Sequence, residues 1–296
     1  MSMFIGSGVA LITPFNEKNE INFEKLKELI EFQILNKTAA IIINGTTGEA
    51  STLSEKEQLL LIKKTVEYVG KRIPVIAGTG SNNTENAIIK SQESEKLGVD
   101  GLLVITPYYN KTNTMGLIEH YKLIANSVKL PIMLYNVPGR TGMNISLEVL
   151  EQLKNIENIV AIKEASGDMT YAMNIARVFG ERYDLYSGND DIILPMISIG
   201  GKGVVSVLAN ILPLETHNIV SKFLEGETEE SRKIQLKLNG FVHSLFVETN
   251  PIPIKKALNL LGWNVGGYRM PLYEISSQGL LILKEEMKKI NIYKEE

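Results

Sequence analysis

The sequence predicts an α/β protein, specifically a TIM (β/α)8 barrel with a C-terminal helical extension. Eight short apolar runs recur at intervals of roughly 20 to 33 residues, a spacing typical of βα repeats. The segments between them carry the periodicity of amphipathic helices, and after about residue 211 only helical patterns remain. With 296 residues, of which 44% are hydrophobic and 22% charged, the chain is long enough to bury such a core.

The predicted strands are short and rich in Val and Ile. In order they are Val9–Ile12, Ala40–Ile43, Ile73–Ala77, Gly101–Ile105, Pro131–Tyr135, the start of the stretch Ile159–Gly167, Tyr183–Tyr186 and Gly203–Val207. A doubly wound open sheet is the structural rival. The Gly-x-Gly-x-x-Gly fingerprint that would favour it is missing after the first strand.

Helices are expected between the strands. Those with clear patterns cover Phe23–Leu35, a segment opened by the capping box Ser54–Glu57, Thr84–Leu97, a segment through Ile118 and Ile124, and Leu147–Leu153. Further helices are expected through Ile219–Phe223, over Ile234–Phe246 and after Asn250-Pro251-Ile252-Pro253. No Pro-, Gly- or Ser-rich linker interrupts the chain. We therefore expect a barrel over residues 1–225 with the extension, residues 226–296, packed on it.

Composition excludes several classes of function. A formal net charge of -3 gives little support for binding nucleic acid or an anionic membrane. Cysteine is absent, so there are no disulfides and no thiolate metal ligands, and His120, His217 and His243 do not have a metal-ligand spacing. The apolar run Phe4–Phe15 lacks the basic leader of a signal peptide, and no other run approaches the roughly 18 to 20 residues of a membrane span. We expect a soluble, cytoplasmic protein without a metal.

Lys163 lies inside the apolar stretch Ile159–Gly167, where lysine is unusual. An amine that is removed from water is partly neutral near pH 7 and can attack a carbonyl to form a Schiff base. The alternative is a structural lysine, whose stem packs near a strand end while its ammonium stays in water. If Lys163 points into the barrel, alternation turns Glu164 outward, away from the amine.

Candidate binding groups follow other predicted strands at the end of the barrel where active sites form. Gly45-Thr46-Thr47-Gly48 suits a small carboxylate, Tyr135 offers a phenol for proton transfer, and Arg140 offers a planar fork for a second carboxylate. Alone, each has an ordinary structural reading as a turn, a packing residue or a surface arginine. Gly200–Gly203 precedes the eighth strand and so lies on the opposite face. Together with Lys163 the set describes a Schiff-base lyase or aldolase.

Six motifs in order strengthen this interpretation. They are Gly45-Thr46-Thr47-Gly48-Glu49, Ile76-Ala77-Gly78-Thr79-Gly80, Thr106-Pro107-Tyr108-Tyr109-Asn110, Tyr135-Asn136-Val137-Pro138-Gly139-Arg140-Thr141-Gly142, Ile162-Lys163-Glu164-Ala165 and Asn250-Pro251-Ile252-Pro253. By these motifs the chain resembles the dihydrodipicolinate synthase family, within the N-acetylneuraminate lyase superfamily of class I aldolases. The likeness covers nearly the whole chain.

The resemblance implies a condensation of pyruvate with L-aspartate 4-semialdehyde, in diaminopimelate and lysine biosynthesis, with no cofactor beyond the imine on Lys163. It implies a proton relay of Thr46, Tyr135 and Tyr109, the last reaching in from a neighbouring subunit. The substrate-binding residues that it implies are Thr47 for the pyruvate carboxylate, the Gly188 and Val205 backbones as pocket lining, and Arg140 for the semialdehyde carboxylate. A homotetramer built from dimers, or the dimer alone, is also implied.

Two other functions stay open on the sequence: a pyruvate-dependent lyase acting on a sugar acid such as N-acetylneuraminate, and a non-catalytic small-molecule sensor. Neuraminate lyases resemble this chain at the lysine and tyrosine but typically lack the arginine, so Arg140 favours the semialdehyde. Lys163, Tyr135 and Arg140 together favour an enzyme over a sensor.

The resemblance also marks an effector site for lysine, at Ala50, Ser51, Glu55, Gln58, Asn82, Asn86 and Tyr108. Family members that lysine inhibits typically carry two histidines and a glutamate where this chain has Glu55, Gln58 and Asn86. Because the carboxylate that would pair with the amino group of lysine is lost, we expect weak or absent inhibition by lysine.

Overall fold

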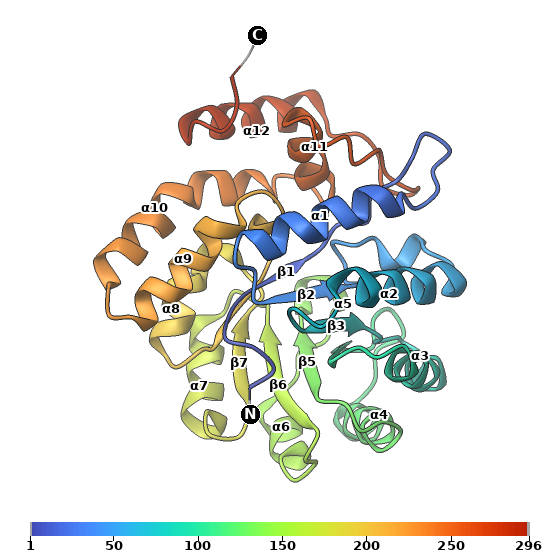
Figure 1. Cartoon of the computed structure of the whole chain (residues 1–296). Coiled ribbons are helices and arrows are strands. Elements are labelled where there is room, and N and C mark those ends of the chain that lie inside the picture. Colours follow the sequence, from blue (N-terminus) through green and yellow to red (C-terminus); the bar gives the residue numbers. More distant parts are fainter. Residues whose placement is uncertain (1, 295–296) are drawn as a thin grey trace.

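The computed structural model describes residues 2–294, which form a closed barrel of eight parallel strands surrounded by helices (Figure 1). The strands are β1 (Gly6–Ala10), β2 (Ala40–Ile43), β3 (Val75–Gly78), β4 (Gly101–Ile105), β5 (Ile132–Asn136), β6 (Ile159–Glu164), β7 (Asp184–Ser187) and β8 (Gly203–Ser206). Each strand pairs with the next along the chain, and β1 pairs with β8. The predicted TIM barrel is confirmed.

Helices follow the strands in turn. Those around the barrel are α1 (Phe23–Leu35), α2 (Glu55–Val69), α3 (Thr84–Lys96), α4 (Thr114–Asn126), α5 (Pro138–Thr141), α6 (Leu147–Leu153), α7 (Met169–Phe179), α8 (Ile193–Ser198) and α9 (Pro213–Leu224). The C-terminal helices are α10 (Thr228–Ser244), α11 (Ile252–Leu260) and α12 (Ser277–Lys289). Short 3-10 turns η1 (Ala50–Thr52), η2 (Asp190–Ile192) and η3 (Leu208–Asn210) follow β2, β7 and β8.

Side chains alternate between two apolar layers, as the pleat of a strand requires. On β5, Met133 and Tyr135 belong to the cluster that fills the barrel, whereas Ile132 and Leu134 belong to the larger cluster between strands and helices. Phe4 enters the interior ahead of β1 and packs on Tyr186, with 4.4 Å between ring centroids. The barrel interior is therefore a packed core, and the space for a ligand lies at the strand ends.

The helix starts follow the polar residues that the sequence places there. Asn22, Ser54 and Asp168 cap α1, α2 and α7 by accepting a backbone N–H three residues later. Ser54 and Glu57 cap each other reciprocally, so the predicted capping box is confirmed.

Several predicted strand boundaries were wrong by one to three residues. The strands predicted from Ile73 and Pro131 begin at Val75 and Ile132, and prolines 74 and 131 lack the N–H that a ladder needs. The eighth strand ends one residue early because the N–H of Val207 bonds to the Asp190 carboxylate instead. The first strand lies at Gly6–Ala10 rather than Val9–Ile12, although the apolar run continues past its end.

Helix α12 was missed from the sequence, although its signals are present. Ser276 is its N-cap, and Leu283 and Met287 are fully buried one turn apart. The long segment of residues 261–276, which has no helix or strand, separates α12 from α11 and obscures the periodicity.

The C-terminal helices pack beside α1 and α9, at one side of the barrel (Figure 1). Trp263, after α11, contacts Phe32 of α1 with 4.7 Å between ring centroids. Leu238, Leu258 and Leu283 belong to the same apolar cluster as the outer faces of the strands. None of the helices described in residues 2–294 is both long and apolar enough to cross a membrane.

His120 on α4 is buried where α4 packs on α3, and its Nδ1 lies 2.9 Å from the Thr84 hydroxyl. Burial lowers the pKa of His120 to about 4, because the charged ring is poorly solvated there. A histidine whose folded pKa is lowered stabilises the fold above the unfolded pKa of 6.5 and ceases to do so as the pH falls through about 4. We expect the free energy of unfolding to fall by at most about 3 kcal/mol across that window.

The measurement is urea unfolding between pH 7 and pH 4, for the wild type and for His120→Gln, which cannot titrate. The variant should show a flatter profile. His243→Gln is the matched control, because the His243 side chain is 64% exposed, and its profile should follow the wild type. An unchanged profile in His120→Gln would contradict the assignment.

Candidate active site

The strand register brings Lys163 and Tyr135 together at the C-terminal ends of β5 and β6. Tyr135 is the direct neighbour of Lys163 on one side, and Tyr186 of β7 is its neighbour on the other. Because alternate residues of a strand share a face, neighbours in register point the same way. Lys163 is 6% exposed, and its Nζ lies 4.1 Å from the centroid of the Tyr135 ring.

The space for the Lys163 side chain depends on Gly188, in the loop that follows β7. A Cβ at Gly188 would lie 3.0 Å from Cε of Lys163 and 2.4 Å from the Cβ of Ala165. The Gly188 N–H donates to the backbone oxygen of Glu164 at 2.7 Å, which fixes this loop against β6. Any larger residue at position 188 would displace the lysine.

Glu164 takes no part in holding the amine, in agreement with the expected alternation. Its carboxylate is buried and accepts hydrogen bonds from the Asn136 amide at 2.7 Å and from the Ser166 N–H at 2.5 Å. Burial raises the pKa of Glu164, against the opposing effect of those two donors. Its contacts tie the strand end to the loop that precedes α7.

The loop after β2 supplies two threonines with different environments. Thr46 is half-buried, whereas Thr47 is buried and its Oγ1 accepts a hydrogen bond from the Asn250 amide at 2.9 Å. Gly48 lies where a Cβ would come within 3.1 Å of the backbone oxygen of Leu11, so the loop packs directly on the segment that follows β1. The loop Gly45–Gly48, which is predicted to bind a small carboxylate, thus lies next to the strand ends.

A cavity of about 740 Å³ opens at this end of the barrel. Of the predicted site residues, Thr46, Tyr135 and Arg140 line it, together with Ala50, Ser51, Glu55, Gln58 and Tyr108 from the predicted effector set. Lys163, Thr47, Gly188 and Val205 are buried or half-buried and are not part of the lining. Lys163 meets the cavity through the ring of Tyr135, against which its amine packs.

Arg140 is exposed on the single turn α5, which follows β5. Its Nη2 donates to the backbone oxygen of Asn250 at 3.1 Å. A hydrogen bond of 2.9 Å between the hydroxyls of Thr141, in this turn, and Thr106, directly after β4, holds the turn in place. Much of the guanidinium stays available to a ligand in the cavity.

Tyr109 is not brought into the cavity of its own chain. Its side chain is 92% exposed to solvent, and its backbone has a positive φ of 71°. The loop around it is held by the Asn110 amide, which donates to the backbone oxygen of Asn82 at 2.9 Å.

A second, more deeply buried lysine was not predicted from the sequence. Lys255 of α11 is fully buried and pairs with Glu49, at 2.7 Å between Nζ and Oε1, and it also donates to the Thr13 backbone oxygen at 3.1 Å. Burial lowers the pKa of Lys255 even against the attraction of Glu49. The only hint in the sequence was Glu49 itself, a carboxylate directly after the Gly45–Gly48 loop.

Arg269 extends this contact. Its backbone N–H donates to the other oxygen of Glu49 at 3.1 Å, and its guanidinium forms two hydrogen bonds with the carboxylate of Glu57 on α2. The guanidinium lowers the pKa of Glu57 to about 2. The C-terminal segment is thereby joined to the loop that carries Thr46 and Thr47.

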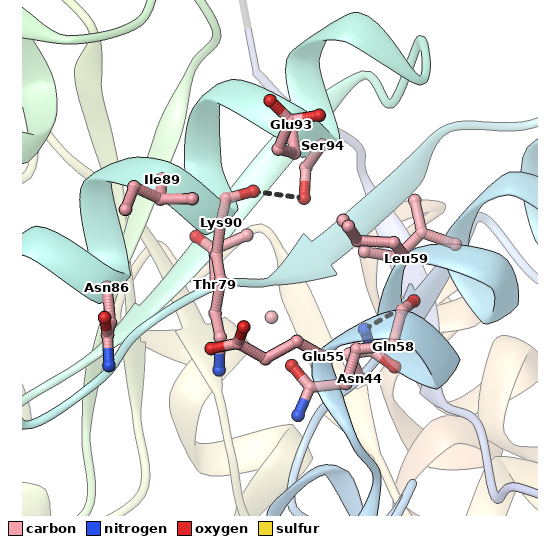
Figure 2. Close-up of a pocket in the computed structure, with 12 residues that line it drawn as sticks. Asn44, Glu55, Gln58, Leu59, Thr79, Asn86, Ile89, Lys90, Glu93 and Ser94 are labelled. Carbon is pink, nitrogen blue, oxygen red and sulfur yellow. Dashed lines mark hydrogen bonds between the residues drawn. The ribbon is translucent and has the colours of Figure 1, made fainter.

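A smaller cavity of about 90 Å³ lies between α2 and α3, where the ends of Glu55 and Lys90 approach each other and Asn86 lies at the edge (Figure 2). The side-chain nitrogen of Gln58, another predicted effector residue, donates to the backbone oxygens of Ala50 at 2.7 Å and Leu53 at 3.1 Å. Gln58 thus uses its donor within the chain. Among residues 2–294, no group of three or more His, Cys, Asp or Glu is arranged to hold a metal ion.

Comparison with known proteins gives consistent matches. The model of the dihydrodipicolinate synthetase family matches residues 3–290. The 4-hydroxy-tetrahydrodipicolinate synthase of Thermoanaerobacter sp. (strain X514) is 53% identical over 100% of this chain and 99% of its own. That of Clostridium perfringens (strain SM101 / Type A) is 54% identical over 97% and 98%. A crystal structure of DHDPS from Cyanidioschyzon merolae with lysine bound has a TM-score of 0.95 at 40% identity, over 99% of this chain and 100% of that one.

The buried ion pair yields a stability prediction. In Lys255→Met the Glu49 carboxylate is left without its cation, and we expect the free energy of unfolding to fall by about 3–5 kcal/mol in urea titrations followed by circular dichroism. Combining Lys255→Met with Glu49→Gln should recover part of that loss, because the uncompensated charge is gone.

Lys256→Met is the matched control. Its partner is Glu274 at 3.3 Å, a pair whose side chains are 29% and 56% exposed, and we expect a loss below about 1 kcal/mol. Equal losses in the two single variants would show that burial of the Lys255 pair carries no special weight.

Proposed function

Because the chain belongs to the dihydrodipicolinate synthetase family, we propose that it condenses pyruvate with L-aspartate 4-semialdehyde through a Schiff base on Lys163. It is a lyase of diaminopimelate and lysine biosynthesis, with 4-hydroxy-tetrahydrodipicolinate synthase activity. The observation that carries the residue assignment is the register of β5 and β6, which sets the Lys163 amine against the Tyr135 ring at the strand ends.

In the first step, neutral Lys163 attacks the ketone carbon of pyruvate, and water leaves to give the imine. Loss of a proton from the methyl group then gives an enamine. The packed surroundings of Lys163 support this chemistry, because they limit the access of bulk water to the intermediate.

Thr46, Tyr135 and Tyr109 would carry the protons that these steps release and consume. Thr46 and Tyr135 line one cavity, within reach of the same bound molecule. Tyr109 is 92% exposed in the single chain, which suits a residue that completes the relay in a neighbouring subunit. On this proposal the working unit is at least a dimer, and a tetramer of two dimers is the arrangement that we propose.

Two carboxylates are held by different loops. Thr47 would bind the pyruvate carboxylate through its hydroxyl and backbone N–H, with the backbones of Gly188 and Val205 lining the pocket. Arg140, at the rim of the cavity, would bind the carboxylate of the semialdehyde. The enamine carbon attacks the aldehyde, and the amino group of the same substrate then displaces Lys163 and closes the ring.

The groups in these roles supply a nucleophile, proton carriers and carboxylate donors, so the proposal requires neither a metal nor an organic cofactor. We propose a cytoplasmic location, in line with the biosynthetic enzymes that this chain resembles. No step calls for a protein or nucleic-acid partner beyond further copies of the chain.

Borohydride trapping tests the lysine assignment. Incubation with pyruvate and borohydride should add the mass of the reduced pyruvate adduct to one peptide, the one that contains Lys163, and Lys163→Ala should abolish the adduct. Lys202→Ala is the matched control, because residue 202 lies in the loop before β8, at the opposite end of the barrel, and it should be trapped like the wild type.

An adduct on Lys255 or any other lysine in Lys163→Ala would overturn the assignment. Turnover of the wild type on pyruvate with aspartate semialdehyde, compared with cleavage of N-acetylneuraminate, then decides the substrate. Neuraminate cleavage as the faster reaction would replace the proposal with a sugar-acid lyase.

Inhibition by lysine provides a separate prediction. The side-chain amide nitrogen of Gln58 already donates to backbone oxygens, and Asn86 offers no negative charge to the amino group of lysine. We therefore expect lysine to inhibit weakly or not at all in initial-rate assays. In this respect the chain would differ from the Cyanidioschyzon merolae protein, whose structure contains bound lysine.

The matched variant combines Glu55→His, Gln58→His and Asn86→Glu, and it should be more sensitive to lysine than the wild type. Half-inhibition of the wild type at submillimolar lysine would contradict the prediction.

A further inference from the structure

We infer that Asn250 is a positioning residue for the substrates: its side chain sets the direction in which Thr47 donates its hydroxyl hydrogen, and its backbone oxygen holds Arg140. The inference rests on the proposed function, in which Thr47 and Arg140 bind the two substrate carboxylates. It gives a role at the reaction site to the C-terminal extension, which otherwise lies outside the barrel.

Asn250 contacts both carboxylate-binding residues. Its side-chain nitrogen donates to Oγ1 of Thr47 at 2.9 Å, and its backbone oxygen accepts from Nη2 of Arg140 at 3.1 Å. Asn250 is only 5% exposed, and its contact with Thr47 is buried, whereas its contact with the exposed Arg140 is partly buried. Thr47 lies in the loop after β2 and Arg140 on the turn α5 after β5, and Asn250 touches both.

The hydrogen bond to Thr47 has a direction, and the direction matters for binding. A hydroxyl that accepts a hydrogen bond from an amide points its own hydrogen away from that amide. Because Asn250 is the donor, the Thr47 hydrogen is free to donate elsewhere, as a carboxylate ligand requires. An acceptor at position 250 would instead take that hydrogen for itself.

Arg140 is held in a way that leaves its binding capacity largely intact. One of its five N–H groups is used by the backbone of Asn250, and the others can form a bidentate contact with a carboxylate. Fixing one corner of the guanidinium reduces the rotamer freedom that an exposed arginine would lose on binding.

Asn250 is itself held in place by the buried pair five residues later. Lys255 on α11 pairs with Glu49, and Glu49 follows Thr47 by two residues. The segments 47–49 and 250–255 are therefore joined at two points, Thr47 with Asn250 and Glu49 with Lys255. Two contacts fix both the distance and the register of the segments, which a single hydrogen bond could not do.

The unused end of the Asn250 amide supports a role beyond packing. Its Oδ1 is buried and has no hydrogen-bond partner within the described part of the chain. A buried acceptor without a partner destabilises a fold, so such groups call for an explanation other than stability. Donation to Thr47 by the other end of the amide provides that explanation.

Steady-state kinetics of Asn250→Asp and Asn250→Ala test the inference. The aspartate has nearly the same size but accepts from Thr47 and adds a negative charge, so the KM for pyruvate should rise about tenfold or more, with kcat changing less. Asn250→Ala should raise the KM for pyruvate by a smaller factor. The KM for the semialdehyde should change less than about twofold in Asn250→Ala, because the backbone contact with Arg140 remains and no charge is added.

Asn259→Ala, on the helix α11 that directly follows Asn250, is the matched control. The Asn259 side chain bonds the backbones of Val265 and Gly266 and does not reach the cavity, so its loss should affect melting temperature without changing the KM for pyruvate. A purely structural role for Asn250 would make its variants behave like Asn259→Ala, and that result would overturn the inference.

A double-mutant cycle gives the decisive readout. In a Thr47→Val background, which has no hydroxyl to orient, Asn250→Ala should change the KM for pyruvate by less than about twofold. An effect as large as in the wild-type background would overturn the inference. In each variant, the pyruvate concentration that gives half-maximal borohydride trapping should change by the same factor as the KM for pyruvate. A wild type that neither traps pyruvate nor turns over the semialdehyde would refute the proposed function instead, so the two failures are distinguishable.

Discussion

Closure of the parallel barrel is the constraint on which the other features depend. β1 and β8 come so close that a Cβ at Gly203 would lie 1.9 Å from the backbone oxygen of Gly6, and the positive φ of 159° at Gly203 is nearly extended. Since every strand then has a neighbour on both sides, no strand can shift its register without breaking two ladders. Tyr135, Lys163 and Tyr186 share one layer because three adjacent strands are locked in this way.

The two buried lysines show how one residue type serves two purposes. Lys255 is fully buried and faces a carboxylate, so its charge is compensated and it joins the extension to the barrel. Lys163 faces an aromatic ring, and the adjacent carboxylate of Glu164 is occupied by Asn136 and Ser166. The carboxylate beside Lys255 gives that lysine a fixed structural partner, whereas the Lys163 amine has no carboxylate partner and suits a nucleophile.

Much of the fold was predictable because it depends on local patterns. Alternating polar and apolar segments gave the eight strands, the Ser54 and Glu57 pair gave the start of α2, and strand alternation gave the outward direction of Glu164. The Lys255 pair was not predictable, because its partner lies 206 residues away and an amphipathic helix with two lysines looks like a solvated one. The Asn250 contacts could not be predicted for the same reason. The motif that contains Asn250 was visible in the sequence, but the segments that Asn250 touches are brought together only by the closed barrel.

The dependence of the cavity on residues 250–269 has a consequence for synthesis. A chain emerging from the ribosome releases all eight strands by Ser206, well before Asn250, Lys255 and Arg269. At that point the loop that carries Thr46 and Thr47 still lacks the residues that anchor it. A prematurely terminated chain would have all eight strand sequences but an unfinished carboxylate site, so substrate binding requires nearly the whole polypeptide.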